Sequence, residues 1–339
     1  MKISGRHLRP LLLGATVLAQ ADPSVPLGPE RHWRIVAIGD SITQGNPVHW
    51  TYRYPLWKML IDAGVDFDFV GSINYYDIVN PDIPPYRGRP FDWEHEGHVF
   101  FQSSEIAGQL PGWLLYGHAG SGGYVPDIAL VHAGTNDALL AQPATGTIAN
   151  LGSIIDTLRS RNPRVHVLLA KIIPIFNPLD PAGSANASAS AINARIDGLA
   201  AAKTTPESRV VVVDHNAGFF PDYTVPPPNG GDTADGVHPS VAGEEKMARR
   251  WFEALQLFLL APALDRDGEG RLTMNFVRMK AATRLTYRLG LSGDLTVWNW
   301  NAAVTESVTS TGPETEIVRM RDFTSEGARF IKLELDYLP

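Results

Sequence analysis

The chain has 339 residues, of which 44% are hydrophobic and 19% are charged, and its formal net charge is −7. These proportions are those of an ordinary globular protein. The length is sufficient for one large and one small domain, or for two domains. The acidic balance argues against a nucleic-acid partner, whose phosphates require a basic face. The sequence holds 0 cysteines, which excludes disulfides, thiolate catalysis and Cys-ligated zinc.

The first 21 residues have the pattern of a secretory signal peptide. Three basic residues and no acidic one precede an apolar run from Leu11 to Leu18. The small residues that follow the run permit cleavage after Ala21. The run is much shorter than the ~20 residues of a spanning helix, and a Pro-rich linker over residues 22–33 follows it. We therefore expect no membrane span and a secreted, periplasmic or cell-surface location. A short buried helix or a membrane anchor is the alternative.

Between residues 34 and 261, short apolar runs alternate with helical patterns. The runs are almost continuous in Ile, Val and Leu, which is typical of strands that are covered on both faces. The predicted strands are 34–39, 67–71, 127–132, 165–173 and 209–214, and the predicted helices are 54–63, 103–115, 147–161, 187–203 and 241–260. This alternation predicts an α/β domain, a three-layer α/β/α sandwich around a five-stranded parallel sheet with right-handed crossovers.

After Leu260 the pattern changes to short runs rich in aromatic and β-branched residues, separated by turn residues. We therefore expect a small C-terminal all-β module over residues 262–339, following the α/β domain at 34–261. Trp298 and Trp300 are two residues apart, so we expect them on one face of a strand, either in the core or as a binding platform. A lid, a polymer-binding module and a surface-attachment element all fit this segment.

In an open parallel sheet, ligands bind outside the carboxyl ends of the strands, and in this sequence those ends carry chemistry. The residues concerned are, in chain order, Ser41, Gly97, Asn136, Asp235 and His238. Ser41 is a nucleophile if a base takes its proton, and His238 is a natural base near neutral pH. Asp235 can accept from the far ring nitrogen of His238. The amides of Ser41 and Gly97 and the side chain of Asn136 can stabilise a developing oxyanion.

These blocks, namely Gly-Asp-Ser, a loop glycine, Gly-x-Asn-Asp and Asp-x-x-His, resemble the SGNH (or GDSL) hydrolase superfamily over about residues 34–260. The resemblance implies a flavodoxin-like fold, Ser41 as nucleophile, His238 as base with Asp235 as its partner, and Gly97 and Asn136 as oxyanion donors. It also implies that the reaction needs no metal and no organic cofactor. The stretch EHEGH, and LPGW followed by PDI, are similar to the family 3 carbohydrate esterases, which include acetyl xylan esterases.

Four further residues are assigned to supporting or substrate-binding roles. Asp40 is expected to cap the turn that carries the nucleophile, and Asp137 to tie neighbouring loops together. Trp50 and Trp93 fall in loops beside the predicted site, where flat rings could stack on a sugar. Core packing is the alternative for both tryptophans.

The sequence thus predicts an exported serine esterase that removes small acyl groups, above all acetyl, from an acylated carbohydrate. A broad lipase-like or thioesterase-like enzyme on the same triad is one alternative. A non-catalytic, glycan-binding protein of the cell surface is another. The glycan and the oligomeric state are left open by the sequence.

Overall fold

The structure is a computed structural model that describes residues 13–20, 32–45, 51–74, 83–117, 122–180, 182–226, 230–259, 262–300, 303–322 and 330–338. The chain divides into two compact units. The α/β unit spans Glu30–Leu255, and the β unit joins Met1–Pro29 to Gln256–Pro339. The division falls inside helix α7 (Val241–Leu259), a little before the predicted boundary at residue 261.

The α/β unit is built on a parallel sheet whose strands follow the order β3-β2-β5-β6-β7, with β4 paired beside the end of β2. This is the flavodoxin-like order, so the predicted fold class is confirmed. The sequence patterns did not indicate β4, because it has only two residues. The strands are β2 (Trp33–Gly39), β3 (Phe67–Phe69), β4 (Glu96–Gly97), β5 (Ile128–His132), β6 (His166–Lys171) and β7 (Val210–Asp214).

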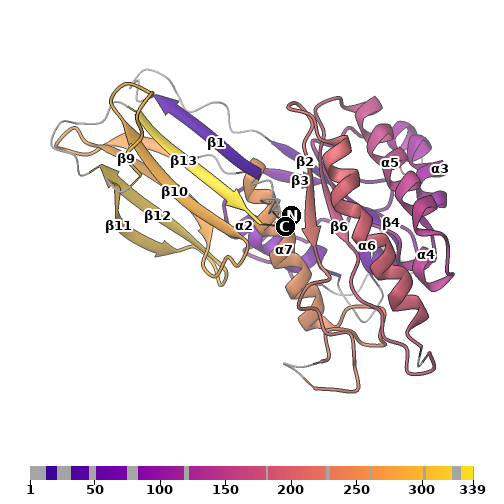
Figure 1. The fold of residues 1–339 in the computed structure, drawn as a ribbon. Coiled ribbons are helices and arrows are strands. Elements are labelled where there is room, and N and C mark those ends of the chain that lie inside the picture. The colour runs from indigo at the N-terminus through magenta and orange to yellow at the C-terminus, as the bar shows by residue number, and fades with distance from the viewer. Residues whose placement is uncertain are drawn as a thin grey trace, which may run out of the picture. The chain divides into compact units, whose positions relative to one another are not determined.

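Helices cover both faces of this sheet, with α3, α5 and α6 on one side and α2 and α7 on the other (Figure 1). Every residue of β5 is buried, which explains its continuous apolar sequence. The short helices α1 and α4 directly follow strand ends and have no apolar period by which to predict them. The helices are α1 (Ser41–Gln44), α2 (Arg53–Asp62), α3 (Ser103–Tyr116), α4 (Thr135–Leu139), α5 (Ala144–Arg161) and α6 (Ser184–Lys203).

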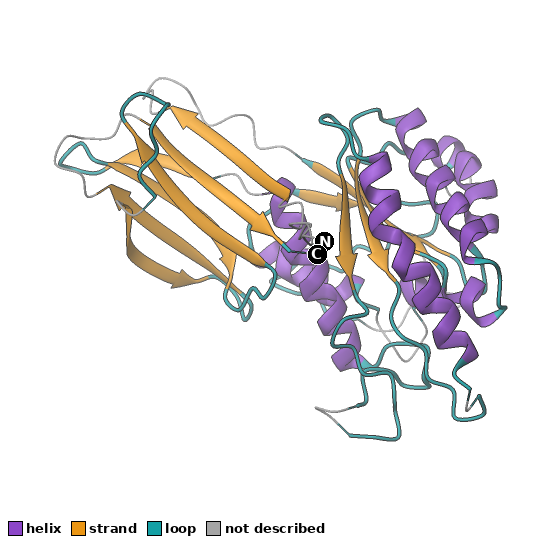
Figure 2. Cartoon of the chain, in the orientation of Figure 1, coloured by secondary structure: helices purple, strands orange, loops and turns teal. Residues whose placement is uncertain are grey.

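The β unit consists of two antiparallel sheets, which confirms the predicted all-β module (Figure 2). One sheet has the order β1-β13-β10 and the other β11-β12-β9-β8. Alternate residues of β13, from Ile331 to Tyr337, are buried, as expected of a strand with one face on a core. The strands are β1 (Leu13–Gln20), β8 (Ala263–Arg266), β9 (Leu272–Met279), β10 (Leu285–Ser292), β11 (Ala303–Ser310), β12 (Thr315–Asp322) and β13 (Phe330–Tyr337).

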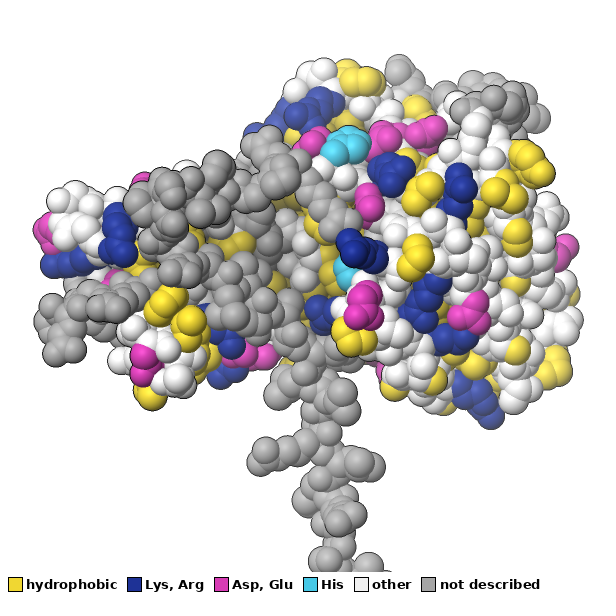
Figure 3. All heavy atoms as spheres, turned by 90° about the horizontal axis from the view of Figure 1, so that it is seen from above, with side chains coloured by type: hydrophobic (Ala, Val, Ile, Leu, Met, Phe, Trp, Pro, Cys, Tyr) yellow, Lys and Arg dark blue, Asp and Glu magenta, His cyan; other side chains and the backbone are white. Residues whose placement is uncertain are grey.

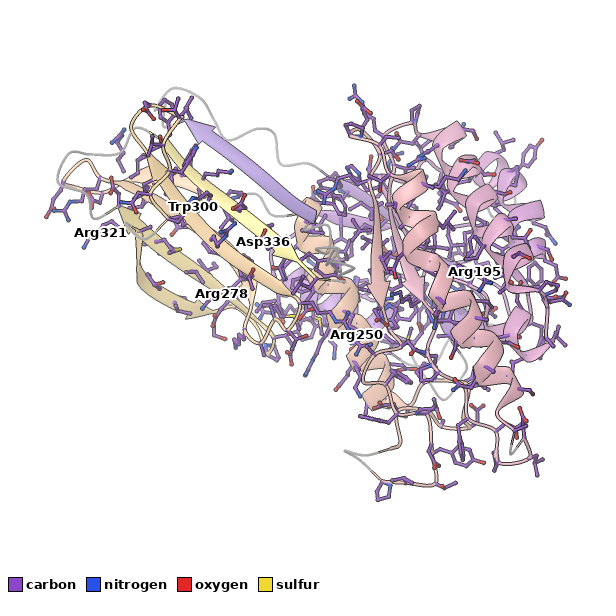
Figure 4. The ribbon with its side chains drawn as sticks, in the orientation of Figure 1. Arg195, Arg250, Arg278, Trp300, Arg321 and Asp336 are labelled. Atoms are coloured by element: carbon purple, nitrogen blue, oxygen red, sulfur yellow. The ribbon has the colours of Figure 1, made fainter. Side chains whose placement is uncertain are left out.

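Trp298 and Trp300 lie outside a regular strand, which corrects the prediction, but their rings do share one face as the two-residue spacing indicated. The segment that contains them forms turns after β10, because the carboxylate of Asp294 accepts hydrogen bonds from the amides of Thr296 and Val297 and so curls the chain. Both rings are half-buried and pack over Gly290, where a methyl group would lie 2.9 Å from the Trp300 ring. Trp300 accordingly lies against the sheet that contains β10 (Figure 4).

Strand β1 falls within the predicted signal peptide. It pairs with β13 along its whole length, from Leu13 opposite Tyr337 to Gln20 opposite Phe330. The signal peptide stays a prediction, and its cleavage after Ala21 would remove this strand. None of the helices in the described ranges combines the length and apolar character needed to cross a bilayer. Acidic and basic side chains are interspersed over the face of the α/β unit seen in Figure 3.

Candidate active site

The turn after β2, residues 39–44 and here called the nucleophile turn, places Ser41 at the carboxyl end of the sheet. Gly39 ends the strand where a side chain would collide with the carbonyl oxygen of His132 and with Thr43, so only glycine fits. Asp40 then caps α1, because its Oδ1 accepts from the amide of Ile42 at 3.0 Å. Burial raises the pKa of Asp40 to about 6. The predicted capping role of Asp40 matches this contact, and Ser41 becomes the first residue of the helix.

Ser41, His238 and Asp235 form one hydrogen-bonded chain. Ser41 Oγ lies 2.9 Å from His238 Nε2, and His238 Nδ1 lies 2.7 Å from Asp235 Oδ2. A carboxylate only accepts, so Nδ1 donates to Asp235, and in the neutral imidazole the lone pair of Nε2 faces the hydroxyl of Ser41. This is the arrangement in which a histidine can take the proton of a serine.

A tight turn holds the acid and the base of this chain together. Asp235 Oδ1 accepts from the amides of Val237 and His238 at 2.9 and 2.7 Å, which fixes the carboxylate three residues before the imidazole. Partial burial works to raise the pKa of Asp235, but the hydrogen bonds from His238 and Val237 lower it overall. The side chains of His238 and Asp235 are 36% and 54% exposed, so this part of the site is open to solvent.

Gly97 lies beside the nucleophile turn, as the sequence predicted, but for a different reason. It pairs with Gly39 in the sheet and packs so closely on α1 that a methyl group would lie 2.7 Å from Gln44 Cα. Its amide donates to His95 Nδ1 at 2.8 Å. In this structure the N–H predicted to serve an oxyanion is therefore already engaged, and Gly97 is required for packing.

Asn136 and Asp137 follow β5 in α4. Asn136 Nδ2 donates to the carbonyl oxygen of Phe101 at 2.9 Å, which uses one of its two hydrogens and leaves the other for a ligand. Asp137 is buried and accepts from the amide of Ser103 at 2.8 Å and from Thr147 Oγ1 at 3.0 Å. Asp137 thus ties α3 and α5 to α4, the loop-tying role expected from the sequence.

Of the two tryptophans predicted to contact substrate, the structure describes only one. Trp50 lies outside the described residues. Trp93 is half-buried and packs edge-on against Phe91, with ring centroids 5.0 Å apart. A substrate contact of Trp93 stays a prediction.

Arg53, which the sequence analysis did not single out, forms hydrogen bonds to the backbone of the nucleophile turn. Its side chain is fully buried and donates to the carbonyl oxygens of Thr43, Gln44 and Trp93 at 3.0, 3.2 and 3.0 Å. It therefore fixes α1 to the loop that precedes β4. No clear signal in the sequence indicated this role, because Arg53 begins a helix that also carries Lys58 and Asp62.

Glu96 was also missed, and it organises the loop after β4. This buried carboxylate accepts from Ser72 Oγ at 2.8 Å and Tyr124 Oη at 2.6 Å, and it pairs with His98 Nε2 at 2.9 Å. His98 in turn stacks on Trp113, with ring centroids 3.8 Å apart. The polar network around Glu96 thereby fixes β4 and the loop that follows it.

Among the described residues, one group of carboxylates has the spacing of a metal site. Oxygens of Asp68, Asp92 and Glu94 lie within 4.8 Å of one another. Burial raises the pKa of Asp92 to about 6 and that of Glu94 to about 7. Asp92 Oδ2 accepts from the amide of Phe69, so the group already ties β3 to the loop before β4. The structure gives no contact between these carboxylates and the Ser41–His238 pair.

Comparison with known proteins gives the same picture as this geometry. Residues 37–246 match the model of the GDSL-like lipase/acylhydrolase family. A carbohydrate esterase of family 3 from Talaromyces cellulolyticus is 31% identical over 67% of this chain and 98% of that chain, with a TM-score of 0.53. An acetyl esterase mutant solved with acetate ion gives the same identity, coverage and TM-score.

A curated relative is larger. The multidomain esterase of Ruminococcus flavefaciens is 27% identical over 67% of this chain and 29% of that protein, so the chain spans less than a third of its length. The family model covers more than half of the chain and includes the nucleophile turn and the Asp235–His238 turn. The chain therefore belongs to the GDSL-like lipase/acylhydrolase family of carboxylic ester hydrolases.

Proposed function

We propose that the protein is an exported serine esterase that removes acetyl groups from carbohydrate. The observation that carries this proposal is the open hydrogen-bonded chain of Ser41, His238 and Asp235 at the carboxyl end of the sheet. The likeness to a family 3 carbohydrate esterase over nearly all of that chain supports the substrate class. The sequence of residues 1–21 supports export.

In the first half of the reaction, His238 Nε2 takes the proton of Ser41 Oγ while this oxygen attacks the ester carbonyl carbon. The carbonyl oxygen becomes an oxyanion, which the amide of Ser41 and the free hydrogen of Asn136 Nδ2 can bind. His238 then gives its proton to the departing sugar oxygen. The C–O bond to the sugar breaks, and the acetyl group stays on Ser41.

In the second half, water attacks the acetyl carbon and gives one proton to His238 Nε2. The bond to Ser41 Oγ breaks, the serine recovers its proton from His238, and acetic acid leaves and gives its remaining proton to solvent to become acetate. Throughout both halves, Asp235 stays ionised and stabilises the imidazolium, since hydrogen bonds keep its pKa below the usual value.

The exposure of the acid–base pair favours a small acyl group on a large alcohol. With His238 36% and Asp235 54% exposed, a bulky sugar chain can approach the pair from solvent. A long fatty acyl chain instead needs an apolar surface deep enough to bury it. The acetate seen with a related acetyl esterase mutant is consistent with a small acyl group.

Acetate release from acetylated xylo-oligosaccharides, measured beside hydrolysis of p-nitrophenyl acetate and octanoate, tests this proposal. We expect release from the oligosaccharide and a preference for the acetate ester. Turnover of octanoate at the higher rate would favour a lipase-like or thioesterase-like enzyme. Glycan binding that is equal in the wild type and Ser41→Ala, with no turnover of any ester, would favour a non-catalytic protein.

A further inference from the structure

We propose that the backbone N–H of Phe100, and not that of Gly97, completes the oxyanion hole. This inference rests on the proposed esterase reaction and adds to it one catalytic group. It concerns the short loop that follows β4 and precedes α3, beside the nucleophile turn.

All but one of the backbone amides in this loop donate a hydrogen bond to another group of the protein. The bonds run from Gly97 to His95 Nδ1, from His98 to the Gly39 carbonyl, from Val99 to Gln44 Oε1 and from Phe101 to the His98 carbonyl, at 2.8, 3.0, 2.9 and 3.2 Å. Across the described part of the chain, the amide of Phe100 has no such acceptor. A donor that the protein leaves unused is available to a ligand.

The residues that flank Phe100 are bonded to the nucleophile turn on both sides of Ser41. His98 donates to Gly39, two residues before the nucleophile, and Val99 donates to Gln44, three residues after it. On its other side, the carbonyl oxygen of Phe101 accepts from Asn136 Nδ2 at 2.9 Å. The loop is therefore fastened around Ser41 and beside the side chain that is expected to bind the same oxyanion.

The backbone of Phe100 is held in a conformation that a phenylalanine rarely adopts. Its φ is +66°, in the left-handed region, which costs about 1 kcal/mol or more for a residue with a side chain. Phe100 as a whole is 82% exposed, so packing of its side chain does not supply that energy. The hydrogen bonds of the neighbouring residues and the stacking of His98 on Trp113 hold the loop instead. Strain of this kind is kept where it orients a functional group.

In the transition state, the N–H groups of Ser41 and Phe100 and the second hydrogen of Asn136 Nδ2 would then donate to the carbonyl oxygen. These donors are fixed before the substrate arrives, so they stabilise the negative charge without reorganisation. The bonds broken and formed in the reaction are unchanged, because Phe100 transfers no proton.

The test replaces a single N–H by oxygen. Phenyllactic acid in place of Phe100, introduced by nonsense suppression, converts the amide into an ester and keeps the side chain. Glycolic acid in place of Gly97 is the matched control. Each protein is assayed for kcat and KM on p-nitrophenyl acetate and for its thermal midpoint.

We expect opposite signatures at the two positions. The ester at 100 should lower kcat by about 10²-fold or more, as loss of one oxyanion donor does, with a nearly unchanged thermal midpoint because no internal hydrogen bond is lost. The ester at 97 should lower the thermal midpoint and leave kcat within about tenfold, since it removes an internal bond. A loss of kcat at 97 equal to or larger than that at 100, or unchanged kcat at 100, would overturn the assignment.

The variant Phe100→Gly provides a second readout. Glycine keeps the N–H and adopts a positive φ without strain, so its loss of kcat should be clearly smaller than that caused by the ester at the same position. A kcat loss as large as that of the ester would show that the ring, and not the N–H, matters. Absence of turnover in the wild type would instead contradict the proposed esterase reaction and not the choice of donor.

Discussion

Gly97→Ala tests whether close packing between β4 and α1 positions the nucleophile. The added methyl group would lie 2.7 Å from Gln44 Cα and from the carbonyl carbon of Thr43, where ordinary contacts begin at 3.4 Å. Both neighbours are backbone atoms of the helix that begins with Ser41, and Arg53 fixes the same carbonyls from the other side. The helix must therefore move by about 1 Å, since no side chain can rotate away.

A displacement of this size has a calculable effect on catalysis and stability. Misplacing a reacting group by about 1 Å costs about 10²-fold in rate, or about 2.7 kcal/mol of transition-state free energy. Overpacking the core at Gly97 should also lower the free energy of unfolding by about 1–3 kcal/mol. We expect kcat on p-nitrophenyl acetate to fall by about 10²-fold, with a smaller change in KM.

Gly108→Ala is the matched control for this substitution. Gly108 lies on the exposed side of α3, where a methyl group meets nothing within 4 Å. Alanine there should raise the free energy of unfolding by up to about 1 kcal/mol and leave kcat unchanged. If Gly97→Ala matched this control in kcat and in urea unfolding, the packing argument would be refuted.

The remaining predictions concern the acid partner, a buried histidine and the N-terminus. Asp235→Asn should lower kcat by about 10²-fold and keep the fold, because the exposed carboxylate orients His238; kcat equal to the wild type in a stopped assay would contradict its role. Burial lowers the pKa of His132 to about 4, so its neutral form is stabilising above pH 6.5 and that stability is lost as the pH falls. Between pH 7 and pH 5 the wild type should lose about 2 kcal/mol of unfolding free energy more than His132→Met; equal losses in urea titrations would count against this. Expressed in a bacterium with its own leader, the secreted protein should have the mass of a chain cleaved after Ala21, and an intact mass would contradict export by cleavage.

The sheet and the order of its helices could be predicted because both faces of the strands are covered, which leaves continuous apolar runs in the sequence. Ser41, at the end of β2, and His238, in the loop that follows β7, could be predicted as neighbours because parallel strands share one carboxyl edge. Strand β4 could not, since two residues give no period. The segment around Trp298 was misread because its aromatic pattern resembles a strand, while the turn depends on the side-chain bonds of Asp294.

The details of the site depended on tertiary contacts that no local pattern encodes. The engaged amide of Gly97 follows from the orientation of the His95 ring. The left-handed backbone of Phe100 follows from hydrogen bonds to residues distant in the sequence, such as Gln44. Arg53 is an ordinary surface residue type, and its fully buried position beneath the nucleophile turn is visible only in the folded chain.

The measurement that tests the account most directly is acetate release from acetylated xylo-oligosaccharides by the wild type and by Ser41→Ala at equal concentration. We expect release by the wild type and a loss of about 10⁴-fold or more in the variant, whose circular dichroism should be unchanged because, among the described residues, the hydroxyl bonds only to His238. Release by folded Ser41→Ala at a rate near that of the wild type would contradict the serine mechanism, and with it the central claim.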